Sequence, residues 1–136
     1  MGKCFSIKCE VKEKGLFDKN VKAAVLKRMH ETVTAVAKKY KSKGLELDAN
    51  CKEGWVLTAT VTSLEVDDPA KPKSMEAKVE IDGAYFGTGG GQKMAAAGKG
   101  KATGIRANKL EDEAKMIVND VLGDLMENKV VPKILE

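Results

Sequence analysis

Two stretches near the middle of the chain alternate apolar and polar residues with a period of two, and this pattern constrains the fold most. In WVLTATV, residues 55–61, one set of positions is apolar and the other is mainly threonine. In MEAKVEI, residues 75–81, one set is apolar and the other carries charge. Such alternation is typical of antiparallel strands that bury one face. We therefore predict two half-buried strands, joined by a hairpin loop at residues 67–73 with its two prolines.

The tract KMAAAGKGKATGI, residues 93–105, has the same period but very small residues, so we predict a third strand there. One face carries Met94, Ala96, Gly98, Gly100, Ala102 and Gly104. We expect this small-residue face to point inward, because small side chains let a helix backbone lie close to the sheet. On the outer face, Lys99 and Lys101 would pair across the ladder with Glu76, Glu80 or Asp82. The glycines of TGGGQ, residues 88–92, predict the connecting hairpin.

The segments on either side show the three- and four-residue spacing of amphipathic helices. In the first helix the apolar stripe consists of Val21, Val25, Met29, Val33, Val36, Ala37 and Tyr40. Asp18 or Asn20 would cap its start, and Gly44 would end it in a left-handed conformation. In the second helix the apolar face consists of Leu110, Ala114, Ile117, Val118, Val121, Leu122, Leu125 and Met126. Asn108 and Glu111 have the spacing of a capping box, and Pro132 would close that helix.

An alternating stretch at residues 4–11 precedes the first helix, so the predicted order is β-α-β-β-β-α. Residues 45–49 suggest a further short extended segment. The predicted fold class is α+β, a two-layer sandwich in which a mostly antiparallel sheet of about four strands carries two helices on one face. The length of 136 residues suits a single domain, residues 1–136.

Positive charge is unevenly distributed along the sequence. Residues 1–43 carry 12 Lys and Arg against 4 Asp and Glu, whereas the remaining residues carry 12 against 16. Only two of the cations, Arg28 and Arg106, are arginines. Readers of base sequence rely on arginine forks, so this composition disfavours base readout and favours a solvated lysine surface.

No carboxylate occurs between Asp82 and Glu111, a span that contains five cations. They are Lys93, Lys99, Lys101, Arg106 and Lys109. Two readings stand side by side: ordinary cross-strand pairing, or a candidate site for an anion or an acidic partner. GKGKATG lacks the ending of a P-loop, and no GxGxxG motif fits these glycines.

We find no catalytic motif, no metal site and no cofactor-binding motif in the sequence, and we predict no enzyme. His30 is the only histidine, and it lies at the edge of the helical stripe without a nucleophile beside it in a known motif. We expect it to be a partly buried structural residue. The three cysteines Cys4, Cys9 and Cys51 lack CxxC spacing, and an oxidising compartment would permit a Cys4–Cys51 or a Cys9–Cys51 disulfide.

The N-terminal sequence lacks the apolar core of a signal peptide, and no apolar run is long enough to span a membrane. The protein is then cytoplasmic, or periplasmic if a leader has been removed. The uncharged strand at residues 56–62 would invite self-association or strand addition by a protein partner if it lay at a sheet edge.

The succession of LTATVTSLEVDD, SMEAKVEIDGAYFG and KMAAAGKGKATGI, followed by an amphipathic helix, resembles small bacterial envelope lipoproteins. The similar groups are the LPS-assembly lipoproteins and, more distantly, the penicillin-binding-protein activators. The resemblance covers residues 55–130 as a pattern of elements and includes no site motif. It implies a non-catalytic periplasmic domain that binds a larger assembly, or an anionic glycan or lipid.

The sequence therefore predicts a non-catalytic binding or assembly domain that acts through a sheet edge or the basic glycine-rich hairpin. The alternative is a cytoplasmic protein that binds nucleic acid or another anion through the basic first helix and residues 93–109.

Overall fold

The structure is a computed structural model that describes residues 3–12 and 19–136. Its strands are β1 (Lys3–Val11), β2 (Leu45–Leu47), β3 (Gly54–Val66), β4 (Ser74–Phe86) and β5 (Lys93–Thr103). Its α-helices are α1 (Lys19–Lys39), α2 (Leu110–Leu125) and α3 (Val131–Leu135). Short 3-10 turns occupy Lys41–Lys43 and Ala107–Lys109, and one π-helical turn occupies Met126–Val130.

The predicted α+β class is confirmed, with one more strand than expected. The sheet has the order β2-β1-β3-β4-β5. β1 lies parallel to both β2 and β3, whereas β3, β4 and β5 form an antiparallel meander. The sheet is mixed because α1 carries the chain back to the end where β1 began, and strands joined by such a crossover run parallel. The short segment after Gly44 thus becomes a true edge strand.

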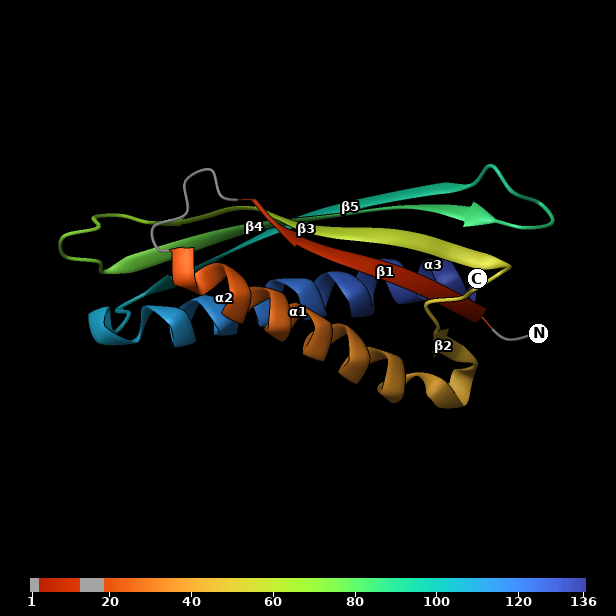
Figure 1. Cartoon of the computed structure of the whole chain (residues 1–136), viewed down its shortest axis with the longest axis horizontal. Coiled ribbons are helices and arrows are strands. Elements are labelled where there is room, and N and C mark those ends of the chain that lie inside the picture. The colour runs from red at the N-terminus through yellow and green to blue at the C-terminus, as the bar shows by residue number, and fades with distance from the viewer. Residues whose placement is uncertain (1–2, 13–18) are drawn as a thin grey trace.

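The molecule has two layers, and Figure 1 shows both long helices against the same face of the sheet. α1 packs on β1 and β2, and α2 packs on β4, β5 and α1. The opposite face of the sheet is covered by no helix or strand within residues 3–12 and 19–136. This arrangement explains the alternation in the sequence, since only one face of each strand meets the core.

The core contains the apolar sets predicted from the two alternating stretches. On β3 they are Trp55, Leu57, Ala59 and Val61, and on β4 they are Met75, Ala77, Val79 and Ile81, all 4% exposed or less. The predicted stripe of α1 is buried from Val21 to Ala37, with Tyr40 half-buried at its end. The low exposed fractions of these residues confirm which face of each element the sequence assigned to the core.

The ends of the helices differ in part from the prediction. Gly44 follows α1 and its 3-10 turn with φ of 93°, as predicted. Of the two predicted caps, Asp18 lies outside the described residues, and Asn20 lies within α1. The predicted capping box is wrong, because residues 107–109 form a 3-10 turn and α2 begins at Leu110 without a side-chain cap.

Pro132 does not close the second helix. The chain continues through the π-helical turn Met126–Val130 into α3, with Pro132 at the start of that helix. Proline lacks an N–H and is tolerated in a first helical turn, where that donor would have no partner. Ile134 is 3% exposed, so the C-terminal segment is packed down as expected.

Both hairpin loops form where the sequence places them. In the β3–β4 loop, Asp67 Oδ1 accepts hydrogen bonds from the backbone N–H groups of Lys73 and Ser74, at 2.9 and 3.1 Å. These bonds lower the pKa of the Asp67 carboxyl because they stabilise its charged form. The β4–β5 loop uses Gly87, Gly89 and Gly91 at positive φ, as its glycine content predicts.

The small-residue face of β5 points inward, and α2 lies close against it. A Cβ atom added to Gly98 would lie 3.3 Å from Leu125 Cδ2, and one added to Gly100 would lie 2.6 Å from Val121 Cγ2. Larger residues would hold the helix away from the sheet. The glycines of this strand therefore have a packing role.

Candidate functional site

β5 forms the long free edge of the sheet. It pairs with β4 without a register shift, from Ser74 opposite Thr103 to Ala84 opposite Lys93. No strand pairs with its other side among the described residues. The opposite edge strand, β2, has only three residues. β5 therefore offers the longer row of backbone groups to another chain.

The register identifies which backbone groups of β5 point outward. The backbone N–H of Tyr85 donates to the carbonyl of Gln92 at 3.0 Å, so these two residues form a hydrogen-bonded pair. Hydrogen-bonded and non-hydrogen-bonded pairs alternate along an antiparallel ladder. The even-numbered residues of β5 therefore bond to β4. The odd-numbered residues point their N–H and C=O groups away from it, and they include Ala95, Ala97 and Lys99.

The five predicted site cations do not form one cluster. Lys93, Lys99 and Lys101 are exposed on the outer face of β5. Lys93 is roughly 20 Å from Lys99 along the strand, whereas Lys99 and Lys101 are about 7 Å apart. Lys109 lies beyond the strand, exposed in a 3-10 turn. The compact part of the predicted site is thus the pair Lys99 and Lys101.

Arg106 has a structural partner. Its Nε donates to Glu113 Oε1 at 2.8 Å, and Glu113 is only 9% exposed. A carboxylate this buried needs a hydrogen-bonded counter-charge, which Arg106 provides. This carboxylate, in the first turn of α2, therefore holds Arg106 in place.

The cross-strand pairs of the two lysines differ from each other. Lys101 lies opposite Glu76, as predicted, but Lys99 lies opposite Lys78. No ion pair within 4 Å involves Lys99 or Lys101 in the described part of the chain. The pairing expected for Lys99 is therefore wrong, because the register puts Glu80 and Asp82 opposite alanines. We call Lys78, Lys99 and Lys101 the β5 basic patch, in which three cations outnumber the carboxylate of Glu76 opposite Lys101.

The double substitution Lys99→Glu with Lys101→Glu is expected to weaken binding to heparin without unfolding the protein. Both side chains are exposed, and two surface charges at about 0.5–1 kcal/mol each correspond to roughly fivefold to thirtyfold in affinity. Retention on a heparin column measures this effect. Lys38→Glu with Lys41→Glu, on the α1 side, makes the same change in net charge. Equal loss of retention in both variants would show that the patch has no special role.

The uncharged strand at residues 56–62, which would have been open to strand addition at a sheet edge, is central. Residues 56–62 lie in β3, which is paired with β1 on one side and with β4 on the other. Strand addition therefore cannot occur there. The alternation in that sequence shows that the strand is half-buried, but it carries no information about its neighbours.

The two basic segments of the alternative function do not share a surface. α1 packs beneath β1 and β2, and the β5 basic patch lies at the other edge and on the opposite face. His30, expected to be partly buried, is exposed on α1. No group of three or more His, Cys, Asp and Glu side chains suited to a metal ion occurs in the described ranges.

The first strand and the loop before β3 are joined by a disulfide between Cys4 and Cys51. Of the two predicted pairings, this is the one that the structure contains. Cys9 is a free thiol on the half-buried side of β1, and burial raises its pKa to about 11. At neutral pH this thiol is protonated and therefore a poor nucleophile. None of the described helices is long and apolar enough to cross a membrane.

No family model matches the sequence, and neither does any curated protein. Among solved structures, a Xanthomonas campestris protein of the family DUF330 is similar, with a TM-score of 0.56 and 8% identity over 96% of this chain and 84% of that one. A candidate lipoprotein from Caulobacter crescentus gives a TM-score of 0.47 and 6% identity over 95% and 87% of the two chains. The rare lipoprotein B of Shewanella oneidensis gives a TM-score of 0.45 and 8% identity over 95% of this chain and 96% of that one. The expected resemblance is thus met in part, as a similarity of fold to the Xanthomonas protein without one of sequence.

Proposed function

We propose that this protein is a non-catalytic binding or assembly domain whose partner adds an extended segment to the free edge of β5. The observation that carries the proposal is that edge: an unbroken strand of eleven residues that, among residues 3–12 and 19–136, has a pairing strand on one side only. An unpaired edge is a template for another strand, and main-chain hydrogen bonds would supply affinity.

The chemistry around the edge supports a partner with acidic residues. The β5 basic patch lies on the outer face of the sheet, where every second side chain of an added strand would also lie. Glutamate or aspartate at these positions would face Lys99 and Lys101. Two copies of β5 paired edge to edge would instead bring their lysines together, and like charges across a ladder are destabilising. We therefore favour a different chain over self-association.

The inner face of an added strand would meet α2. Ile117 and Val121 lie beneath Gly100. An apolar side chain on the inner face of the partner strand would extend the apolar surface that these two residues form. The partner segment is thus one that alternates acidic and apolar residues.

The disulfide supports an oxidising compartment such as the bacterial cell envelope, since disulfides persist there and are rare in the cytosol. The similarity to the Xanthomonas protein concerns the fold alone and adds no partner. The proposal for the compartment and the proposal for the edge rest on separate observations.

Ala97→Pro is expected to abolish strand addition and leave the fold intact. The N–H of Ala97 points to the free edge, so proline removes a donor to the partner and none to β4, and proline is tolerated on edge strands. A peptide of about ten residues alternating Glu and Val serves as the probe. Its affinity, followed by NMR chemical shifts of the β5 amides, should fall at least about tenfold, as expected for one lost hydrogen bond and a steric clash.

Ala97→Thr is the matched control, because it changes the same exposed position but keeps the N–H. It should bind the peptide as the unmodified protein does, and a peptide with Lys in place of Glu should bind weakly. Equal binding by Ala97→Pro and Ala97→Thr would overturn the proposal. A concentration-dependent dimer that Ala97→Pro abolishes would identify a second copy, rather than an acidic segment, as the partner.

A further inference from the structure

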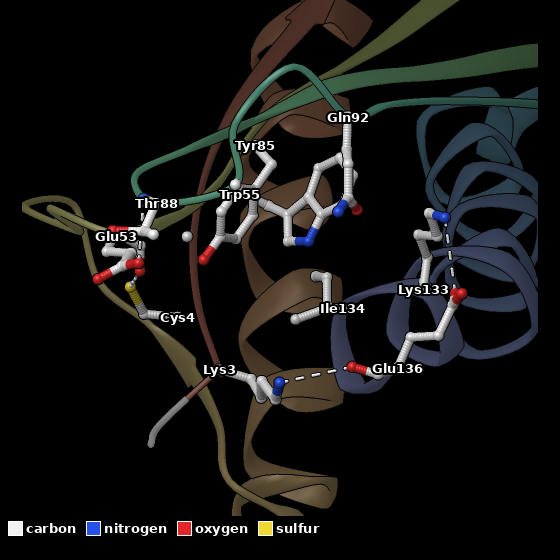
Figure 2. Close-up of a pocket in the computed structure, with 12 residues that line it drawn as sticks. Lys3, Cys4, Glu53, Trp55, Tyr85, Thr88, Gln92, Lys133, Ile134 and Glu136 are labelled. Carbon is white, nitrogen blue, oxygen red and sulfur yellow. Dashed lines mark hydrogen bonds and ion pairs between the residues drawn. The ribbon is translucent and has the colours of Figure 1, made fainter.

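A second candidate site, unconnected with the β5 edge, is a cavity of about 540 Å³ at the end of the sheet where the β4–β5 loop lies. Figure 2 shows the side chains that surround it. They come from the start of β1, the start of β3, the end of β4, the glycine-rich loop and α3. The volume is in the range that holds small organic ligands.

Trp55 forms the inner wall of the cavity. Its ring contacts that of Tyr85 edge to face, with centroids 5.7 Å apart, and only 4% of the residue is exposed. Its indole N–H makes no hydrogen bond to any described residue and is not among the polar atoms sealed from solvent. In Figure 2 this N–H points toward Ile134, across the cavity. This donor faces the cavity and is open to solvent, so an acceptor group of a ligand can hydrogen-bond to it there.

The charged groups of the cavity are two lysines and two glutamates. Lys3 Nζ lies 3.4 Å from the backbone oxygen of Glu136, and Lys133 Nζ lies 3.6 Å from Glu136 Oε2. Figure 2 shows the Gln92 amide beside Trp55. The two amino groups thus flank one acidic residue at the mouth of the cavity.

The carboxylate of Glu136 is a replaceable partner. The side chains of Lys133 and Glu136 are 37% and 70% exposed, and ion pairs this exposed contribute little free energy. Glu53 lies across the cavity and already accepts a hydrogen bond from the Thr88 backbone N–H at 3.2 Å. An incoming anion would therefore meet Lys3 and Lys133 rather than Glu53.

We propose that this cavity binds a small organic anion with an apolar body. The apolar body of the ligand lies against Trp55 and Ile134, and one of its oxygen atoms accepts a hydrogen bond from the indole N–H. The anionic group displaces the Glu136 carboxylate from Lys133 and also meets Lys3. No bond is made or broken, and the site selects its ligand by charge and by an apolar group of limited size.

Trp55 is the only tryptophan in the chain, so its fluorescence reports on the cavity directly. Titration with phenylacetate is expected to change the emission saturably. Phenylacetamide, which has the same body without the charge, is expected to bind roughly tenfold more weakly, a difference of about 1.4 kcal/mol. Lys3→Gln with Lys133→Gln should weaken phenylacetate binding by a similar factor, and Glu136→Gln should strengthen it about threefold by removing the competitor.

Lys38→Gln with Lys41→Gln is the matched control and should bind phenylacetate normally, as should Ala97→Pro, because the edge of β5 is elsewhere. Circular dichroism confirms that each variant is folded. The inference is overturned if the emission changes linearly without saturation, if the amide binds as tightly as the acid, or if the Lys3 and Lys133 double variant keeps full affinity.

Discussion

Loss of the Cys4–Cys51 disulfide is expected to lower the free energy of unfolding by about 2–4 kcal/mol. The two cysteines are 47 residues apart, and in the chain-entropy account a loop of this size contributes ~4 kcal/mol by restricting the unfolded chain. The bridge also connects β1 to the loop before β3. A Cβ atom added to Gly54 there would lie 2.2 Å from the carbonyl oxygen of Cys4 and 2.5 and 2.8 Å from the two sulfur atoms. Urea unfolding of Cys4→Ser with Cys51→Ser, followed by Trp55 emission, measures the loss.

Cys9→Ser provides the control for this experiment. Cys9 is a free thiol, so its substitution removes a cysteine without removing a bridge. Reductant should destabilise the Cys9→Ser protein as much as the unmodified one and should leave the double variant unchanged. An unfolding midpoint that is the same with and without reductant would contradict a stabilising disulfide.

Gly100→Val is expected to lower the free energy of unfolding by about 1–3 kcal/mol, the usual range for overpacking a core. Even a single Cβ at this position would lie 2.6 Å from Val121 Cγ2 and 3.4 Å from Ile117 Cγ2. Valine and isoleucine side chains are stiff at χ1 in a helix, so neither methyl group can turn aside at low cost. Thermal unfolding should show a Tm lower by about 3–9 °C.

Ala95→Val is the matched control for Gly100→Val, since it enlarges a residue of the same strand on its exposed outer face. Its effect should remain within about 0.5 kcal/mol, as for most surface substitutions. If the two variants were equally stable, the close approach of α2 to β5 would not be a constraint on this sequence.

The sequence predicted the parts of the fold that depend on local periodicity. The alternation around Leu57 and Val79 assigned the buried face of both strands, because that face has the same spacing whatever lies beside the strand. The inward glycines of β5 were predicted for the same reason. The order of the strands was not predictable, because a parallel neighbour does not change the alternation of apolar and polar residues in a half-buried strand. An edge position for β3 therefore remained open in the sequence, and only the structure shows that β1 pairs with its other side.

The candidate sites were predictable to different degrees. Lys99 and Lys101 were correctly placed on one face by the period of the strand, but Lys78 lay outside the basic tract and only the register brings it next to Lys99. The ion pair of Arg106 with Glu113 was not predicted, because no local pattern links a turn residue to a carboxylate in the next helix. The cavity around Trp55 had no signal in the sequence, since its residues come from five separate segments.

The position of β1 between β2 and β3 has a consequence for the order in which the protein folds. β3, β4 and β5 are joined by hairpin loops, so each strand can pair with the strand that is next to it in the sequence. β1 must instead pair with β3 across about fifty intervening residues, as in the pairing of Cys4 with Gly54. Until it does so, the meander presents two open edges instead of one. We infer that the late arrival of β1 is the step at which a folding chain is most exposed to aggregation.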